Sequence, residues 1–344
     1  MIKVKLGKTG ITVNKNGFGA LPIQRVSQSE AVGLLHKAFD HGIDFYDTAH
    51  SYSDSEIKLG AAFGNHRRDK IIIATKTGSQ TAEGFRRDLE TSLSQLATDH
   101  IDIYQFHNPA FCPRPGDGTG LYEAALEAQK QGKIRFIGIT NHRLKVAREA
   151  VESGLFATLQ FPFSYLSAGP DLELAEQCRA QNMGFIAMKA LSGGLIADSA
   201  AAYAFMAEFK HVEPIWGIQR ETELDEFLLY QDAPPELSGE IKAKIERDRN
   251  ELSGDFCRGC GYCLPCPAGI EINNCARMSL MLRRAPQAYW LSPEWQKKME
   301  KILECLHCGH CTSMCPYGLD TPELLKKNYA DYRTFLPDGA SDLT

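Results

Sequence analysis

Short apolar segments alternate with amphipathic ones along the first two thirds of the chain. Eight segments are apolar or β-branched and bounded by turn residues, as buried β-strands are: 17–20, 45–48, 71–75, 103–107, 136–140, 158–161, 185–188 and 214–218. Between them, apolar residues recur with helical spacing at 27–41, 84–96, 121–131, 144–153 and 171–182. The first of these begins with Ser27 and has Glu30 three residues later, which is typical of a helix N-terminus.

Eight strands that alternate with helices predict an α/β protein, and specifically a (β/α)8 TIM barrel. A doubly wound parallel sheet is the rival architecture, but no strand is followed by the G-x-G-x-x-G pattern that often accompanies it. Ahead of the first barrel strand, segments 3–6 and 11–14 flank a turn at 7–10. We expect an N-terminal β-hairpin there, at the bottom of the barrel.

The composition changes near residue 231, where a Gln-Asp-Ala-Pro-Pro segment is followed by a highly charged helical pattern at 240–252. From residue 255 the chain becomes rich in cysteine. These changes predict a barrel domain at 1–232, a helical linker at 233–254, a mainly helical, cysteine-rich domain at 255–330 and a tail at 331–344.

Overall composition excludes several classes of protein. The 38 Lys and Arg against 43 Asp and Glu residues give a formal charge of −5, which argues against a nucleic-acid partner. Hydrophobic residues at 43% and charged residues at 24% exclude wholesale disorder. The longest uncharged run, 153–170, contains Gln160, Pro162 and two glycines, so we expect no membrane span. The first residues lack the apolar stretch of a signal peptide, and a cytoplasmic location is the expectation.

Cysteine spacing gives the first chemical signal. Of 11 cysteines, nine fall between residues 257 and 315, and eight of these form two motifs. The motifs comprise Cys257, Cys260, Cys263 and Cys266, then Cys305, Cys308, Cys311 and Cys315. The second has the ferredoxin spacing, in which three thiolates hold one [4Fe–4S] cluster and the fourth reaches the other. We therefore predict a ferredoxin-like domain at 255–330 with two [4Fe–4S] clusters, and a pair of structural zinc sites is the alternative. The first motif is one residue shorter, so its crossing thiolate stays open.

Polar residues at strand ends give the second signal, because the carboxyl ends of barrel strands carry catalytic groups. Asp47, Lys76 and His107 end the second, third and fourth predicted strands, and Tyr52 lies in the loop after Asp47. A tyrosine is a weak acid with an ordinary pKa near ~10, and an adjacent ammonium stabilises its phenolate. An imidazole can donate a hydrogen bond to a carbonyl oxygen. Such a set polarises a carbonyl group and protonates the developing alkoxide.

These residues resemble the aldo-keto reductase family over approximately residues 1–230. The segment Leu6-Gly7-Lys8-Thr9-Gly10 is similar to the family's opening hairpin, and Asp47-Thr48-Ala49-His50-Ser51-Tyr52 to its Asp-Thr-Ala-x-x-Tyr motif. Lys76 and His107 match the remaining members of its catalytic tetrad. The resemblance implies that Tyr52 is the general acid, that Asp47 and Lys76 tune it, and that His107 positions the carbonyl.

The resemblance also implies NAD(P)H as cofactor, bound across the barrel mouth. Thr140, Asn141 and Gln160 match the polar residues that hold the nicotinamide amide. Met188 stands near the place where the family often has an aromatic residue. After the eighth strand, Arg220 is the nearby cation for a 2′-phosphate, and two glutamates follow it. NADPH, NADH and a reaction without a nicotinamide therefore all stay open.

Three functions remain open from the sequence. The first is a reductase for a small-molecule carbonyl, or a dehydrogenase for the alcohol, whose clusters are structural or redox-sensing. The second is a ferredoxin-type reductase, in which clusters pass single electrons to a barrel-bound substrate and an electron-transfer partner protein supplies them. The third is a non-enzymatic electron-transfer or redox-sensing subunit. The complete tetrad argues for an enzyme.

Overall fold

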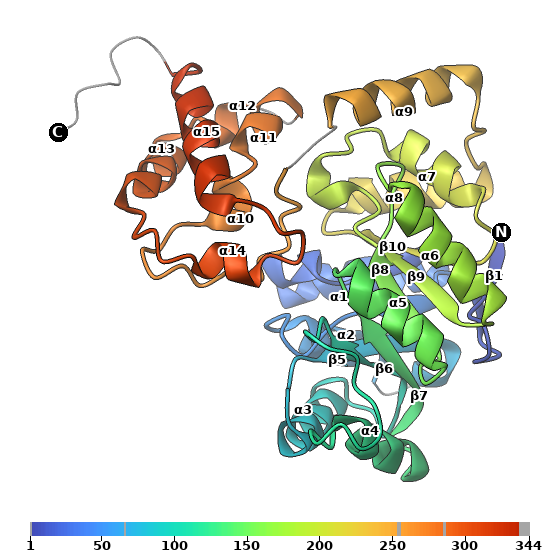
Figure 1. Cartoon of the computed structure of the whole chain (residues 1–344). Helices are drawn as coiled ribbons and strands as arrows, with labels where there is room; N and C mark the ends of the chain where they lie inside the picture. The colour runs from blue at the N-terminus through green and yellow to red at the C-terminus, as the bar shows by residue number, and fades with distance from the viewer. Residues whose placement is uncertain (1, 65–66, 253–255, 285–286, 337–344) are drawn as a thin grey trace. The chain divides into compact units, whose positions relative to one another are not determined.

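The computed structural model in Figure 1 describes residues 2–64, 67–252, 256–284 and 287–336. It divides into two compact units. Unit 1 comprises Met1–Ala190 and Ala200–Lys242, and unit 2 comprises Leu191–Ser199 and Ala243–Thr344.

Unit 1 is a closed barrel of parallel strands in the order β10-β3-β4-β5-β6-β7-β8-β9 (Figure 1). The strands are β3 (Gly17–Gly19), β4 (Phe45–Asp47), β5 (Ile72–Thr77), β6 (Ile101–His107), β7 (Ile134–Thr140), β8 (Thr158–Pro162), β9 (Gly184–Met188) and β10 (Val212–Gly217). Each of the eight predicted strands is present, and the (β/α)8 prediction is confirmed. The closed order excludes the doubly wound sheet.

A helix follows each barrel strand. These helices are α1 (Gln28–Asp40), α2 (Ser55–Phe63), α3 (Ala82–Gln95), α4 (Leu121–Lys130), α5 (Leu144–Ser153), α6 (Gly169–Ala180), α7 (Ser199–Ala207) and α8 (Glu221–Asp232). Helix α1 begins with the predicted capping box, in which Ser27 accepts from the Glu30 N–H and the Glu30 carboxylate accepts from the Ser27 N–H. Short 3-10 helices lie at Pro22–Arg25, Arg68–Lys70, Ser192–Gly194 and Lys301–Glu304.

The N-terminal hairpin pairs β1 (Lys3–Lys5) with β2 (Thr12–Asn14) in antiparallel register. Its apolar side chains are buried in one cluster with residues of β4, β5, β6, β9 and β10. The cluster includes Phe45, the first residue of β4, so the hairpin covers the amino-terminal end of the barrel as predicted. Each such side chain contributes about 1.5–3 kcal/mol when fully buried. The hairpin leaves the carboxyl ends of the strands uncovered, which is the end of such a barrel where catalytic groups lie.

Unit 2 is mainly helical outside the segment Leu191–Ser199. Helix α9 (Gly239–Glu251) leads into it, followed by α10 (Ile272–Cys275), α11 (Met278–Arg284), α12 (Gln287–Trp290), α13 (Pro293–Glu300), α14 (His310–Met314) and α15 (Thr321–Arg333). The cysteine motifs lie between and within these short helices. Across the described ranges, no helix combines the length and the apolar character needed to cross a bilayer.

The predicted boundaries differ from these units in three places. The helical linker predicted at 233–254 is divided between the two units at Lys242, within α9. The segment Leu191–Ser199, predicted within the barrel domain, clusters with unit 2 because residues of unit 2 hold its backbone. The tail predicted from residue 331 begins inside α15, where Tyr332 is buried and donates a hydrogen bond to the Trp290 carbonyl. The rest of that tail, 337–344, lies outside the described residues.

Candidate active site and cluster-binding cavities

A buried ion pair joins the ends of β4 and β5. Lys76 Nζ lies 2.6 Å from Asp47 Oδ1 and donates a second hydrogen bond of 2.6 Å to the Thr48 carbonyl. Asp47 and Lys76 are 3% and 1% exposed. Burial raises the pKa of Asp47 and lowers the pKa of Lys76, and the attraction within the pair opposes both changes. The carboxylate therefore fixes the direction of the Lys76 side chain.

Tyr52 and His107 lie beside this pair. Lys76 Nζ is 5.3 Å from the centre of the Tyr52 ring, and the rings of Tyr52 and His107 meet edge to face with centroids 5.9 Å apart. Burial, assisted by the charge of Lys76, lowers the pKa of His107 to about 3. The imidazole is therefore neutral near pH 7, with one nitrogen to donate and one to accept a hydrogen bond. All four residues predicted as a tetrad come together.

Gln105 belongs to the same group and was not predicted. Its Nε2 lies 3.4 Å from Asp47 Oδ2 and 3.3 Å from Gln160 Oε1, and Gln105 is fully buried. In the barrel register Gln105 pairs with Lys76. The signal was present in the sequence, because Gln105 lies two residues before His107 and alternate residues of a strand share a face.

The residues predicted to hold a nicotinamide amide end the next two strands. Thr140 ends β7 and pairs with Gln160 of β8, and the Asn141 N–H donates to the Gln160 carbonyl at 3.0 Å. All three side chains are at most 1% exposed. The Asn141 side chain donates to the Pro109 carbonyl at 2.9 Å and accepts from the Arg143 N–H at 2.8 Å. The three residues thus continue the polar row of the tetrad around the barrel.

The other two predicted cofactor residues differ in setting. Met188 ends β9 and packs, half-buried, against the apolar cluster inside the barrel. Arg220 immediately precedes α8 and is exposed, and its Nη2 lies 2.6 Å from Glu223 Oε1. A phosphate at Arg220 would therefore compete with a carboxylate of the same chain.

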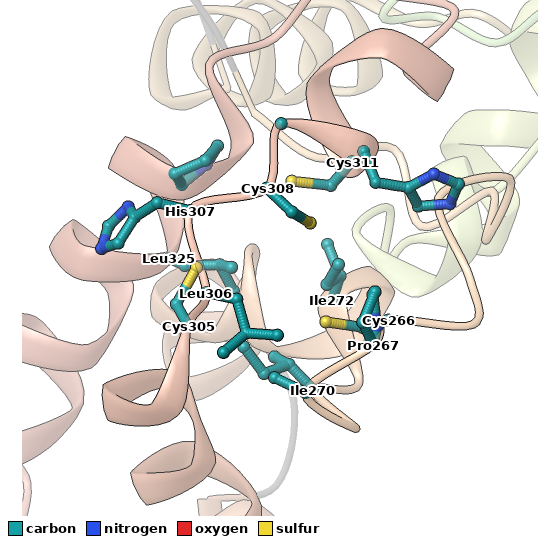
Figure 2. A pocket seen from close by; sticks show the side chains of 14 residues that line it. Cys266, Pro267, Ile270, Ile272, Cys305, Leu306, His307, Cys308, Cys311 and Leu325 are labelled. Atoms are coloured by element: carbon teal, nitrogen blue, oxygen red, sulfur yellow. The ribbon is translucent and has the colours of Figure 1, made fainter.

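The eight motif cysteines line two cavities in unit 2. The first, here called the Cys305 cavity, is drawn in Figure 2 with cysteine side chains on different sides of one space and His307 turned away. Its cysteines are Cys266, Cys305, Cys308 and Cys311. The second, here called the Cys257 cavity, is lined by Cys257, Cys260, Cys263 and Cys315, and Cys311 borders it as well. Each motif thus sends its last cysteine to the cavity of the other motif, the arrangement that ferredoxin spacing predicts.

Both cavities fit a multi-atom thiolate-bound group. Each is lined by at least four cysteine side chains, and the empty space at the two cavities, part of it open to solvent, is about 380 and 330 Å³. Within the described residues, no trio of His, Cys, Asp or Glu converges closely enough to hold a single metal ion. The Gly259 N–H donates to Cys257 Sγ at 3.4 Å, and such bonds to ligand sulfur are one of the means by which a protein tunes a cluster.

A parallel barrel with polar side chains at its strand ends, in a chain with paired cysteine cavities, is the arrangement expected of an oxidoreductase with an iron–sulfur domain. Comparison with known proteins agrees. The model of the aldo/keto reductase family matches residues 15–226, and that of a 4Fe-4S dicluster domain matches residues 256–320. The chain belongs to the aldo/keto reductase family and carries an additional C-terminal 4Fe-4S dicluster domain.

Individual relatives match the barrel part of the chain. The uncharacterized oxidoreductase YrpG of Bacillus subtilis is 30% identical over 224 residues, covering 57% of this chain and 68% of its own length. L-galactose dehydrogenase of Arabidopsis thaliana is 30% identical over 211 residues, covering 56% and 66%. Among solved structures, aldo-keto reductase AKR11C1 from Bacillus halodurans superposes with a TM-score of 0.63 at 20% identity. That match covers 72% of this chain and 96% of the other, and supports the fold alone.

Proposed function

We propose that the barrel catalyses the reduction of a small-molecule carbonyl, or the oxidation of the corresponding alcohol, with Tyr52 as the proton donor and acceptor. The observation that carries this proposal is the position of the Lys76 ammonium. It is anchored by Asp47 and the Thr48 carbonyl and lies 5.3 Å from the centre of the Tyr52 ring. A cation held at that place stabilises the phenolate over the phenol and makes Tyr52 a better acid.

His107 would orient the substrate. Because its pKa is lowered to about 3, the imidazole stays neutral and donates one N–H without adding a charge to the site. A hydrogen bond from that N–H to the carbonyl oxygen polarises the C=O bond and holds the oxygen beside the Tyr52 hydroxyl. Gln105 and Gln160 contact Asp47 and each other, so they would keep the Asp47 carboxylate in place beneath Lys76.

NAD(P)H is the proposed hydride source. When bound, its nicotinamide supplies two electrons as hydride to the carbonyl carbon. Thr140, Asn141 and Gln160 fit the carboxamide end, because three polar, buried side chains sit together on adjacent strand ends. At the adenosine end of the cofactor, Arg220 would contact the 2′-phosphate, but its guanidinium already forms an ion pair with Glu223. We therefore propose that the 2′-phosphate contributes little and that NADH serves as well as NADPH.

For the iron–sulfur domain we propose two [4Fe–4S] clusters, one in each cavity. Cys305, Cys308, Cys311 and Cys266 would hold one, and Cys257, Cys260, Cys263 and Cys315 the other. Burial raises the pKa of the Cys263 thiol to about 12, so its thiolate depends on the positive charge of the bound metal.

A second candidate function follows from the same cavities. Clusters accept and give single electrons. An electron-carrier protein would reduce the clusters, the clusters would pass single electrons to the barrel substrate, and Tyr52 would supply protons. The pairing of Arg220 with Glu223 favours this candidate, because it weakens the contact with a 2′-phosphate that would otherwise help to anchor NADPH. The proton chemistry of Tyr52 is the same in both candidates, and only the source of electrons differs.

The test is a Tyr52→Phe variant assayed anaerobically with NADH, NADPH or chemically reduced protein against a panel of aldehydes, ketones and alcohols. Tyr289→Phe is the matched control, because Tyr289 lies in α12 and is 61% exposed. We expect Tyr52→Phe to lose at least 100-fold in kcat/KM, within the range that a positioned general acid contributes. Equal loss in Tyr289→Phe, or none in Tyr52→Phe, would contradict the proposal.

A further inference from the structure

Arg277 is a buried cation at the junction of two loops in unit 2. It lies between α10 and α11 and is 9% exposed. Its Nη1 donates a hydrogen bond of 2.9 Å to the carbonyl of Gly193. Gly193 belongs to the segment Leu191–Ser199, which continues from the barrel strand β9.

The same guanidinium packs against the first cysteine motif. A Cβ atom placed on Gly259 would lie 2.8 Å from Arg277 Cζ, and one placed on Gly193 would lie 2.9 Å from Arg277 Nη1. Both glycines have left-handed backbone angles, with φ of +65° and +66°. Glycine at these two positions lets the backbones of both loops approach one planar guanidinium.

This packing brings the positive charge close to a cluster ligand. Arg277 packs against Gly259, and the Gly259 N–H donates to Cys257 Sγ at 3.4 Å. A cluster held by four thiolates is negatively charged, and its reduction adds one further negative charge. A nearby cation therefore stabilises the reduced form more than the oxidised form.

We propose that Arg277 is a positioning residue that raises the reduction potential of the cluster in the Cys257 cavity and docks the segment Leu191–Ser199 onto that cysteine motif. The proposal rests on the proposed function only in requiring that clusters are bound. The redox step is the transfer of one electron from a donor to the cluster, with no bond formed or broken. In the test below the donor is dithionite.

Arg284 provides the matched control. Its Nε donates to the Leu195 carbonyl at 2.7 Å, so it holds the same segment, while its guanidinium pairs with Asp248 and Glu251. Replacing Arg284 therefore loosens the segment and removes one positive charge without touching the packing at Gly259. A comparison of the two arginines separates the electrostatic effect on the cluster from the docking of the loop.

The experiment is an anaerobic redox titration of the full-length protein with dithionite, followed by electron paramagnetic resonance, after iron content has been measured. We expect Arg277→Gln to make one of the two clusters about tenfold harder to reduce, which is about 59 mV for one electron, and to leave the other unchanged. Arg277→Lys keeps the charge, so it should shift the reduction potential of that cluster by less than half as much as Arg277→Gln does. Arg284→Gln should leave both potentials as in the native protein.

Three results would overturn the proposal: no shift in Arg277→Gln, an equal shift in Arg284→Gln, or a shift in Arg277→Lys as large as in Arg277→Gln. If the Arg277→Gln protein is recovered without iron, the Gly193→Ala variant is measured in its place. The Cβ atom added at residue 193 displaces the Arg277 guanidinium, while the charge of Arg277 is kept. That variant should shift the same cluster in the same direction, and an unchanged potential would overturn the proposal. The redox titration needs no substrate turnover. Iron-loaded protein that reduces no carbonyl would therefore contradict the proposed function and leave the role of Arg277 unaffected.

Discussion

Replacing Lys76 with methionine tests the proposed role of the ammonium beside Tyr52. The substitution keeps much of the side-chain volume and removes the charge 5.3 Å from the centre of the Tyr52 ring. A unit charge at that distance stabilises a phenolate by about 3 kcal/mol at an effective dielectric constant of about 20. At about 1.36 kcal/mol for each factor of ten, the variant should lose roughly 100-fold in kcat/KM at neutral pH. Alcohol oxidation, which needs the phenolate, should recover as the pH is raised.

The same substitution leaves the Asp47 carboxylate buried without its ammonium. Removing one partner of a buried ion pair costs about 3–5 kcal/mol of folding stability. Burial already raises the pKa of Asp47, so without Lys76 the folded protein favours the protonated carboxyl. A carboxyl whose folded pKa is raised stabilises the fold at low pH, and this stability is lost as the pH rises. The variant should therefore be closest to the native protein in stability near pH 5 and furthest from it near pH 8.

The double variant Asp47→Asn with Lys76→Met separates the two effects. It removes the buried charge as well, so urea unfolding of the double variant at pH 8 should show recovered stability, while kcat/KM stays low. Activity restored together with stability would refute the reasoning, because the ammonium would then matter only for folding. An unchanged pH profile of alcohol oxidation in Lys76→Met would refute it as well.

Three further predictions concern other parts of the molecule. His107→Gln keeps a neutral hydrogen-bond donor and should retain far more kcat/KM than His107→Ala; equal losses in both variants would contradict a donor role. Because the pKa of His107 is lowered to about 3, neither the native protein nor the glutamine variant should show a break in the pH profile from this residue between pH 5 and 8. Cys266→Ser should empty the Cys305 cavity rather than the Cys257 cavity, so iron analysis and electron paramagnetic resonance should report loss of one cluster and survival of the cluster that Arg277 tunes; survival of both signals would contradict the crossing. Burial raises the pKa of Glu213 well above 4.5, so the folding stability of the barrel should fall as the pH rises above 4.5. In urea unfolding from pH 5 to 9, Glu213→Gln should make the folding stability depend less on pH. An identical pH dependence in both proteins would contradict a raised pKa of Glu213.

The sequence predicted the barrel strands well because each is a short apolar segment between turns. It missed helix α7 for a physical reason: most of its side chains are buried, so it has no polar face and no amphipathic period. Helix α2 was missed because Glu56 and Lys58 are buried within it and interrupt the apolar pattern. Both polar groups have partners distant in the sequence that form only in the folded barrel, Glu56 with the Thr75 hydroxyl and Lys58 with the carbonyls of Ile23 and Val26.

Candidate site residues could be proposed from the sequence where a strand end carries an unusual side chain, as at Asp47 and Lys76, and the structure brings these two side chains together. Gln105 was overlooked because its spacing from His107 is the one signal in the sequence, and its contact with Asp47 forms only in the folded barrel. The association of Leu191–Ser199 with the cysteine-rich unit was not predictable. It depends on hydrogen bonds such as that from Arg277 to Gly193, which joins residues 84 positions apart.

The two candidate functions differ in the source of electrons, and binding of a nicotinamide cofactor distinguishes them. The measurement is anaerobic calorimetry of NADH and NADPH with cluster-replete protein. We predict that both bind with a stoichiometry of one and with similar affinity, because the Arg220 guanidinium is paired with Glu223 and adds little for a 2′-phosphate. Failure of both to bind would contradict hydride transfer, and electrons would then have to reach the barrel substrate from the clusters.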